Sequence, residues 1–97
     1  MRVISKKILR EFWKTHNDSE QQLKSWYSEA SKANWSSPNE IKKLYAKASI
    51  LKNNRVVFDI CGGSYRLIVK VNYNRGWVFI RFIGTHKNYD KVDAENI

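Results

Sequence analysis

Apolar and polar residues alternate between Ile50 and Tyr89 in a pattern that predicts a meander of antiparallel β-strands. Three runs with a period of two residues are separated by the segments CGGS and NRG, whose glycines are typical of turns. In each run one alternating set of positions is apolar, so one face of the predicted sheet is apolar throughout. The residues of that face are Val56, Phe58 and Ile60 in the first run, Tyr65, Leu67, Val69, Val71 and Tyr73 in the second, and Val78, Ile80 and Phe82 in the third.

The lengths of the two turns predict how these strands are paired. A loop of four residues, Cys61–Ser64, and a turn of two residues, Arg75–Gly76, keep the apolar faces of neighbouring strands matched. A slip of one residue would move every side chain to the other face, so this register is favoured. The register places the following residues opposite each other: Asp59 and Arg66, Arg55 and Lys70, and Lys70 and Arg81.

The predicted outer face of the sheet therefore carries a row of cations, Arg55, Lys70 and Arg81. Like charges opposite each other destabilise a sheet, so this row is a poor choice for stability and a good one for binding a polyanion. Trp77 and Phe79 lie among the cations, together with further apolar residues. RNA suits such a mixture, because its bases stack on aromatic rings while its phosphates pair with cations. The alternative is an ordinary solvated face with spaced lysines.

Apolar residues before the sheet recur at helical spacing and predict an antiparallel helical hairpin. Residues 1–4 suggest a short strand, and Ser5 is the predicted N-cap of the first helix. After a break at Asn17–Asp18, Ser19 and Gln22 match the capping-box pattern at the start of the second helix. The predicted inward-facing residues are Ile8, Leu9, Phe12, Trp13 and His16, followed by Leu23, Trp26, Tyr27 and Ala30.

A third, short helix is predicted after Ser37, with Pro38 at its first position and Glu40 completing a second capping box. Ile41, Leu44 and Tyr45 are its apolar residues. The predicted fold class is therefore α+β, with a helical hairpin and a short helix packed on the apolar face of an antiparallel sheet of three to four strands. Residues 1–97 form one domain, because a chain of this length holds one core.

The charge balance narrows the range of partners. Lys and Arg outnumber Asp and Glu by 18 to 9, which gives a formal net charge of +9. On a small domain this excess favours nucleic acid, the ribosome or another acidic partner. Three of the cations, Lys6, Lys7 and Lys14, lie on the outer face of the first predicted helix and form a second basic patch for RNA or the ribosome.

The single cysteine and the two ends of the chain add further expectations. Cys61 has no partner for an internal disulfide and no Cys or His at metal-ligand spacing, which favours a reducing cytoplasm and argues against a metal site. The segment MRVISKKILR lacks the apolar region of a signal peptide, and no apolar run is long enough to span a membrane. Residues 93–97 are expected to form no more than a frayed turn.

Candidate chemistry gathers after the last strand. No phosphate-binding glycine loop, nucleophile triad or paired acidic cluster is visible, so we expect no cofactor and no metal. RNA supplies its own nucleophile, the 2′-hydroxyl, and the protein then needs a base, an acid and cations around the transition state. His86 is the candidate for proton transfer, because the charge of histidine ordinarily changes near neutral pH. Around it, Tyr89 is a candidate for base stacking or proton transfer, Arg66, Arg81 and Lys70 for phosphate binding, and Lys87 and Lys91 for RNA or ribosome binding.

Three segments together resemble a known family. The runs WSSPNEIKKLYAKASIL, RVVFDICGGSYRLIVKV and IRFIGTHKNYDK are similar to HigB-type toxins of the RelE-like superfamily. The resemblance covers nearly the whole chain, from Arg2 to Lys91, and is most specific in Gly62 to Leu67 and Gly84 to Lys91. It implies a RelE-like fold, cleavage of mRNA in the ribosomal A site, and inhibition by a helix-turn-helix antitoxin.

The resemblance also implies roles by position. The arginine of the G-x-x-R-L segment falls on Arg66, and the T-H-x-x-Y-D segment falls on Thr85, His86, Tyr89 and Asp90. Members of the family often carry Asn where Ser64 stands in this chain. The leading hypothesis is a ribosome-dependent mRNA endonuclease, and the alternative is a non-catalytic RNA- or ribosome-binding module that uses the same cationic face. A DNA-binding domain ranks last, because no helix-turn-helix pair with a polar recognition face is visible.

Overall fold

A five-stranded sheet forms the centre of the protein, and the computed structural model describes every residue from Met1 to Ile97. The strand order is β1-β5-β4-β3-β2; β1 is parallel to β5, and the other neighbours are antiparallel. The α+β class is confirmed; β1 matches the short strand suggested for residues 1–4, and β2 takes the sheet one strand beyond the predicted three to four. The elements are β1 (Arg2–Ile4), α1 (Lys6–Thr15), the 3₁₀ turn η1 (Asn17–Ser19), α2 (Glu20–Lys32), α3 (Pro38–Leu44), β2 (Ser49–Ile50), β3 (Arg55–Ile60), the 3₁₀ turn η2 (Cys61–Gly63), β4 (Tyr65–Asn72), β5 (Trp77–Thr85) and α4 (His86–Tyr89).

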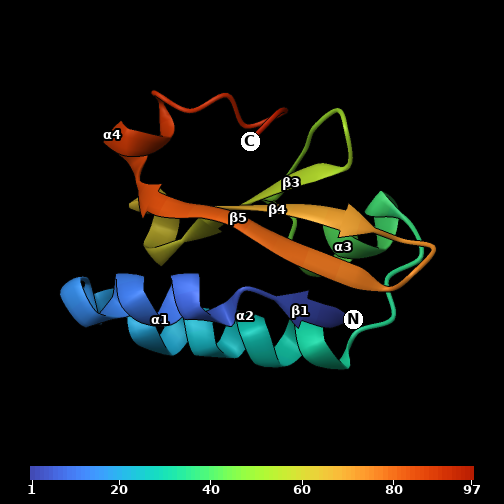
Figure 1. The fold of residues 1–97 in the computed structure, drawn as a ribbon, viewed down its shortest axis with the longest axis horizontal. Coiled ribbons are helices and arrows are strands. Elements are labelled where there is room, and N and C mark those ends of the chain that lie inside the picture. The colour runs from blue at the N-terminus through green and yellow to red at the C-terminus, as the bar shows by residue number, and fades with distance from the viewer.

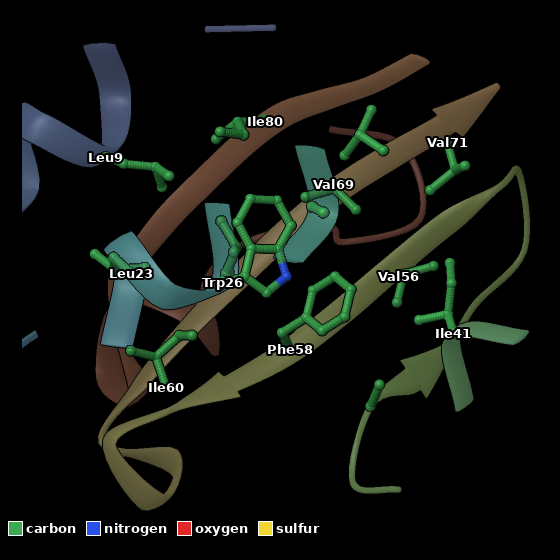
Figure 2. Packing of buried hydrophobic residues seen from close by; sticks show 14 of the residues in the cluster. Leu9, Leu23, Trp26, Ile41, Val56, Phe58, Ile60, Val69, Val71 and Ile80 are labelled. Carbon is green, nitrogen blue, oxygen red and sulfur yellow. The ribbon is translucent and has the colours of Figure 1, made fainter. Parts of the chain in front are cut away.

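The sheet separates two layers of different character. Helices α1 and α2 lie together on one face, whereas α4 and the C-terminal segment lie on the other (Figure 1). The core fills the space between the sheet and the helices, where Leu9 and Leu23 are fully buried. Trp26 of α2 packs edge-to-face on Phe58 of β3, with ring centroids 5.4 Å apart (Figure 2). Full burial of a leucine or phenylalanine contributes about 1.5–3 kcal/mol, so this one layer accounts for much of the folding energy.

The hairpin of β3 and β4 has the predicted register. Asp59 lies opposite Arg66, and Arg55 lies opposite Lys70. The loop occupies Cys61–Ser64 as expected, and it turns through a positive φ at Cys61, Gly62 and Gly63. The alternation of apolar residues on these strands is strong enough to determine the pairing.

The hairpin of β4 and β5 differs from the prediction. Its turn has four residues, Tyr73 to Gly76, and Asn72 pairs with Trp77. The backbone N–H of Gly76 donates to the Asn72 carbonyl at 2.9 Å, and the Asn72 side-chain oxygen accepts from the Arg75 N–H at 3.0 Å. A two-residue turn of type I′ would require a positive φ at Arg75 as well as at Gly76, and type II′ would need the glycine first. Asn72 instead closes a longer loop.

The longer turn overturns the predicted row of cations, because it places Lys70 opposite Phe79 instead of Arg81. Beyond this point β5 has a β-bulge: Val69 pairs with Ile80 whereas Ile68 pairs with Phe82, so Arg81 is the extra residue. An extra residue reverses the faces beyond it. Ile83 therefore packs against the core in the place predicted for Phe82.

Phe82 lies on the outer face, where its ring covers Gly84. A Cβ added at Gly84 would lie 2.5 Å from Phe82 Cζ, so a larger residue at this position would displace the ring. The contact places an aromatic side chain beside Arg66, because Gly84 is the register partner of Arg66.

Helices α1 and α2 begin at the predicted residues, but the predicted capping hydrogen bonds are not formed. Ser5 has a φ of 76° and makes no side-chain cap. Ser19 is buried and donates to the His16 carbonyl at 2.7 Å, while Gln22 accepts from the backbone of Cys61 instead of closing a capping box. None of the helices is both long and apolar enough to cross a membrane.

Helix α3 begins at Pro38, but its capping contact also differs from the prediction. Glu40 accepts from the N–H of Ser36 at 2.7 Å rather than from Ser37, and this bond lowers the pKa of the Glu40 carboxyl. Ile41 is buried as predicted, whereas Leu44 is 65% exposed.

The C-terminal segment is not a frayed turn, which corrects the prediction for residues 93–97. It crosses the outer face of the sheet (Figure 1), where the main-chain oxygen of Ile97 accepts from Arg55 Nε at 3.1 Å and from Arg81 Nε at 3.3 Å. Val57 and Ile68, which point to this face, are fully buried. The outer face is therefore partly covered by the chain itself, and Arg55 is only 9% exposed.

Candidate functional site

Arg66 is a cation on the outer face of the sheet that is fixed by its neighbours and still accessible. Its Nη1 lies 3.1 Å from Asp59 Oδ1, and its Nε donates to the Gly63 carbonyl at 3.4 Å. The side chain is 22% exposed, so the pair is partly shielded from water. Planar guanidinium groups present several donors in a rigid fork, which suits a phosphate. The loop of the β3–β4 hairpin thus orients this fork while leaving it accessible.

Helix α4 brings a tyrosine ring to the same guanidinium. Arg66 Cζ lies 5.5 Å from the centroid of the Tyr89 ring, within the range of a cation–π contact. The helix is held in place at its start, because Thr85 Oγ1 accepts from the Asn88 N–H at 3.2 Å and the His86 N–H donates to the Ser64 carbonyl at 3.0 Å. The second bond fastens α4 to the loop that precedes Arg66.

His86 lies beside this pair on the first turn of α4. Its ring centroid is 6.4 Å from that of Tyr89, and its Nδ1 is 3.4 Å from Asp90 Oδ2. A carboxylate beside Nδ1 is a contact that can orient an imidazole ring. The side chain is 54% exposed, so a substrate can reach it. These four side chains, Arg66, Tyr89, His86 and Asp90, together with Asp59, are called the Arg66 site below.

The Arg66 site combines a guanidinium fork, an aromatic ring and an imidazole. These are the parts that metal-free transfer chemistry on a phosphodiester needs. No three His, Cys, Asp or Glu side chains gather closely enough to hold a metal ion.

Three predicted cations lie outside this site. Lys70 is exposed four residues along β4, about 13 Å from Arg66 at the rise of a β-strand. It borders a 420 Å³ hollow with Asn54 and the β4–β5 turn. Arg55 and Arg81 are both held by Ile97, as described above. The structure therefore brings together Arg66, Tyr89 and His86, but not Lys70 or Arg81.

The remaining predicted binding residues are spread over three regions. Lys87 and Lys91 are exposed on and just after α4, next to the Arg66 site. Trp77 and Phe79 make an edge-to-face pair, with centroids 5.9 Å apart, at the other end of the sheet, and Arg75 lies over the Trp77 ring. Lys6, Lys7 and Lys14 are exposed on α1, on the opposite side of the sheet (Figure 1).

A family model described as HigB_toxin, the RelE-like toxic component of a toxin–antitoxin system, matches residues 19–92. The chain belongs to this family. The matched segment contains every residue of the Arg66 site and the whole sheet except β1. The chain is also 27% identical over 94 residues to the mRNA interferase HigB of Escherichia coli O6:H1, and the alignment covers 95% of this chain and 91% of that protein.

Within this HigB-type toxin, Asp59 is the residue of the site that the sequence did not single out. The register predicted that it lies beside Arg66, and the ion pair shows the consequence. The sequence does contain a sign of this role. Asp59 is the one carboxylate among the outward-facing residues of the paired strands, whose other charged residues are cations.

A second polar cluster lies where the hairpin loop meets the helices. Tyr65 Oη donates to Asp18 Oδ1 at 2.7 Å, and this hydrogen bond raises the pKa of Tyr65. Burial, and then the charge of Asp18, raises the pKa of the Cys61 thiol. His16 stacks on Phe12 with ring centroids 4.1 Å apart, in agreement with its prediction as the last residue of the inward-facing stripe of α1. The cluster joins η1 to the loop that precedes Arg66.

Proposed function

We propose that this HigB-type toxin is an mRNA interferase: an endoribonuclease that cleaves translated mRNA on the ribosome. The observation that carries the proposal is the Arg66 guanidinium, held between Asp59 and Tyr89 beside an accessible His86. The name of the Escherichia coli relative supports the same activity. The formal net charge of +9 supports an RNA partner.

In the proposed reaction the RNA 2′-hydroxyl attacks the adjacent phosphorus, and the bond from phosphorus to the 5′-oxygen breaks. The Arg66 fork binds the non-bridging oxygens, where charge increases in the transition state. One proton must leave the 2′-hydroxyl and another must reach the departing 5′-oxygen; His86 transfers one of these two protons, and Asp90 keeps the His86 ring oriented. The Tyr89 ring stacks against a base and fixes the guanidinium from its other side.

Other side chains are proposed to bind without taking part in the reaction. Lys87 and Lys91 flank the Arg66 site and would contact neighbouring phosphates. Lys70, Trp77 and Phe79 extend the outer face and suit a continuing RNA strand. Arg55 and Arg81 are proposed as RNA contacts only if the C-terminal segment moves away from them.

The proposed partners are mRNA, ribosomal RNA and an antitoxin of helix-turn-helix type that inhibits the toxin in the cytoplasm. A domain of this net charge attracts an acidic contact surface. An antitoxin that blocks access to the ribosome would suffice for inhibition, even if it left the Arg66 site uncovered.

A non-catalytic RNA-binding module is the second candidate. The observation in its favour is that Trp77, Phe79 and Lys70 make a stacking and cationic surface far from His86. The test of both candidates is single-turnover cleavage of mRNA on programmed ribosomes, with ribosome affinity measured separately. We expect cleavage by the purified protein; undiminished binding without any cleavage would establish the second candidate instead.

A further inference from the structure

Residues of α1 and α2 line a basic groove of 490 Å³. The two helices lie on the face of the sheet opposite α4 of the Arg66 site (Figure 1). Helix α1 lines it with Lys6, Arg10 and Trp13, and α2 lines it with Lys24, Tyr27 and two serines. The lining holds three cations and no carboxylate. We call it the α1–α2 groove.

The groove follows from the spacing of residues on the two helices. Lys6, Arg10 and Trp13 stand at positions i, i+4 and i+7 of α1, which places them on one stripe. That stripe runs beside the buried Leu9, and the matching stripe of α2 runs beside Leu23 and Ala30. Two polar stripes thus meet above the seam where the helices pack.

Two lysines cross the groove and rest on aromatic rings of the opposite helix. Lys6 Nζ of α1 lies 4.2 Å from the ring centroid of Tyr27 of α2. Lys24 Nζ of α2 lies 5.4 Å from the ring centroid of Trp13 of α1. Lysine side chains ordinarily lose much conformational entropy on binding. Here the rings already order the ammonium groups, so less is lost when an anion binds.

Acidic residues near the groove do not cancel its charge. Glu20, one turn before Lys24, pairs with that lysine at 2.5 Å and lies outside the lining. Lys6 and Arg10 make no ion pair. At least two of the three cations are therefore available to a ligand.

We propose that the α1–α2 groove binds the sugar–phosphate backbone of an RNA strand, as a second RNA site separate from the Arg66 site. Three cations attract phosphates, and serine hydroxyls supply hydrogen bonds to phosphate oxygens. A volume of 490 Å³ falls within the range of ligand sites. The proposal rests on the proposed function for its choice of RNA as partner, and it gives the toxin RNA contacts on both sides of its sheet.

The test measures binding in the absence of cleavage. The probe is a fluorescent RNA of about 12 nucleotides with every 2′-hydroxyl methylated, which cannot supply the nucleophile. Its affinity is measured by anisotropy over a series of salt concentrations. The variant Lys6→Ala/Arg10→Ala/Lys24→Ala is compared with the control Lys43→Ala/Lys47→Ala/Lys52→Ala, which removes the same charge from exposed residues outside the groove.

We expect the groove variant to reduce the slope of log affinity against log salt by about 2, since each lost phosphate contact contributes about 0.7 for a single strand. The control should leave the slope nearly unchanged. A second variant, Tyr27→Leu, keeps every charge and should weaken binding by about 3-fold through loss of the ring under Lys6. Thermal unfolding of each variant checks that the domain is intact.

Equal loss of slope in the groove variant and its control would overturn the proposal, because it would show only general attraction. An unchanged salt slope in the groove variant would overturn the proposal as well. This holds also if the groove variant loses affinity for the antitoxin, because the groove would then bind protein and not RNA. Ribosome-dependent cleavage by the parent protein is scored separately, so a failure of the groove proposal is distinguishable from a failure of the proposed function.

Discussion

The Arg66 site and the α1–α2 groove are both basic, yet they hold their cations in different ways. The Arg66 guanidinium is fixed by an ion pair, a backbone carbonyl and a tyrosine ring, and the side chain is 22% exposed. Lysines of the groove remain accessible, with Lys24 52% exposed; Lys6 is ordered by a ring face alone, and Lys24 by a ring face and its pair with Glu20. A fixed planar donor suits charge that develops at one place in a transition state, whereas accessible ammonium groups add affinity along a backbone. This difference predicts that chemistry and binding can be separated by substitution.

The largest expected effect is at His86. His86→Ala should lower single-turnover cleavage by about 10²–10⁴-fold, the usual contribution of a general acid or base. Ribosome affinity should hardly change, because the ring carries little of the protein's charge. The protein's other histidine supplies the matched control: His16→Ala lies at the end of α1 and should cleave at nearly the parent rate once folded. If His86→Ala cleaves at the parent rate, the proton must instead be transferred by Tyr89 or a lysine.

Arg66→Lys tests whether geometry matters beyond charge. The substitution keeps one positive charge but loses the fork, the bond to Gly63 and the planar contact with Tyr89. Cleavage on programmed ribosomes should fall by about 10²-fold, comparable to the loss of one oxyanion donor. Arg75→Lys, at the far turn, is the control and should cost little. A cleavage rate for Arg66→Lys equal to the parent rate would remove the distinction between the two regions.

Asp59 should affect the reaction through Arg66 alone. Asp59→Asn keeps the shape but removes the charge-assisted hydrogen bond, which ordinarily contributes about 1.5–3 kcal/mol. We expect cleavage about 10-fold slower, and the same substitution in an Arg66→Lys background should cost much less. A double-mutant cycle on cleavage rates measures this coupling. Independent, additive losses would show that Asp59 does not orient the guanidinium.

The Arg66 site was largely predictable because its residues are close in the paired strands or in the sequence. The four-residue loop and the alternating pattern placed Asp59 opposite Arg66, and His86 and Tyr89 lie on one short helix with Asp90 directly after it. Arg81 was misplaced because Asn72 closes a turn of four residues where the sequence predicted two, and because nothing in the local pattern signals the bulge between Ile80 and Phe82.

Contacts between distant segments were beyond the sequence pattern. The bonds from Arg55 and Arg81 to Ile97 depend on where the C-terminal segment crosses the sheet, which its few apolar residues do not determine. The pairing of Lys6 with Tyr27 depends on how α1 and α2 are packed. Helical spacing placed Trp13 and Tyr27 in the core, whereas both also border the groove.

Tyr89 should give the smallest effect, and it decides which part of the side chain matters. Tyr89→Phe keeps the ring over the Arg66 guanidinium and removes only the hydroxyl, so cleavage should stay within about 3-fold of the parent if the ring orients Arg66 and stacks a base. Tyr89→Leu removes the ring and should cost about 10-fold or more, since stacking on one base contributes about 1–3 kcal/mol. Measurement of both variants in single turnovers separates the two roles. If Tyr89→Phe is as slow as Tyr89→Leu, the hydroxyl takes part in proton transfer, and the Arg66 site then holds two proton-transfer groups in place of one.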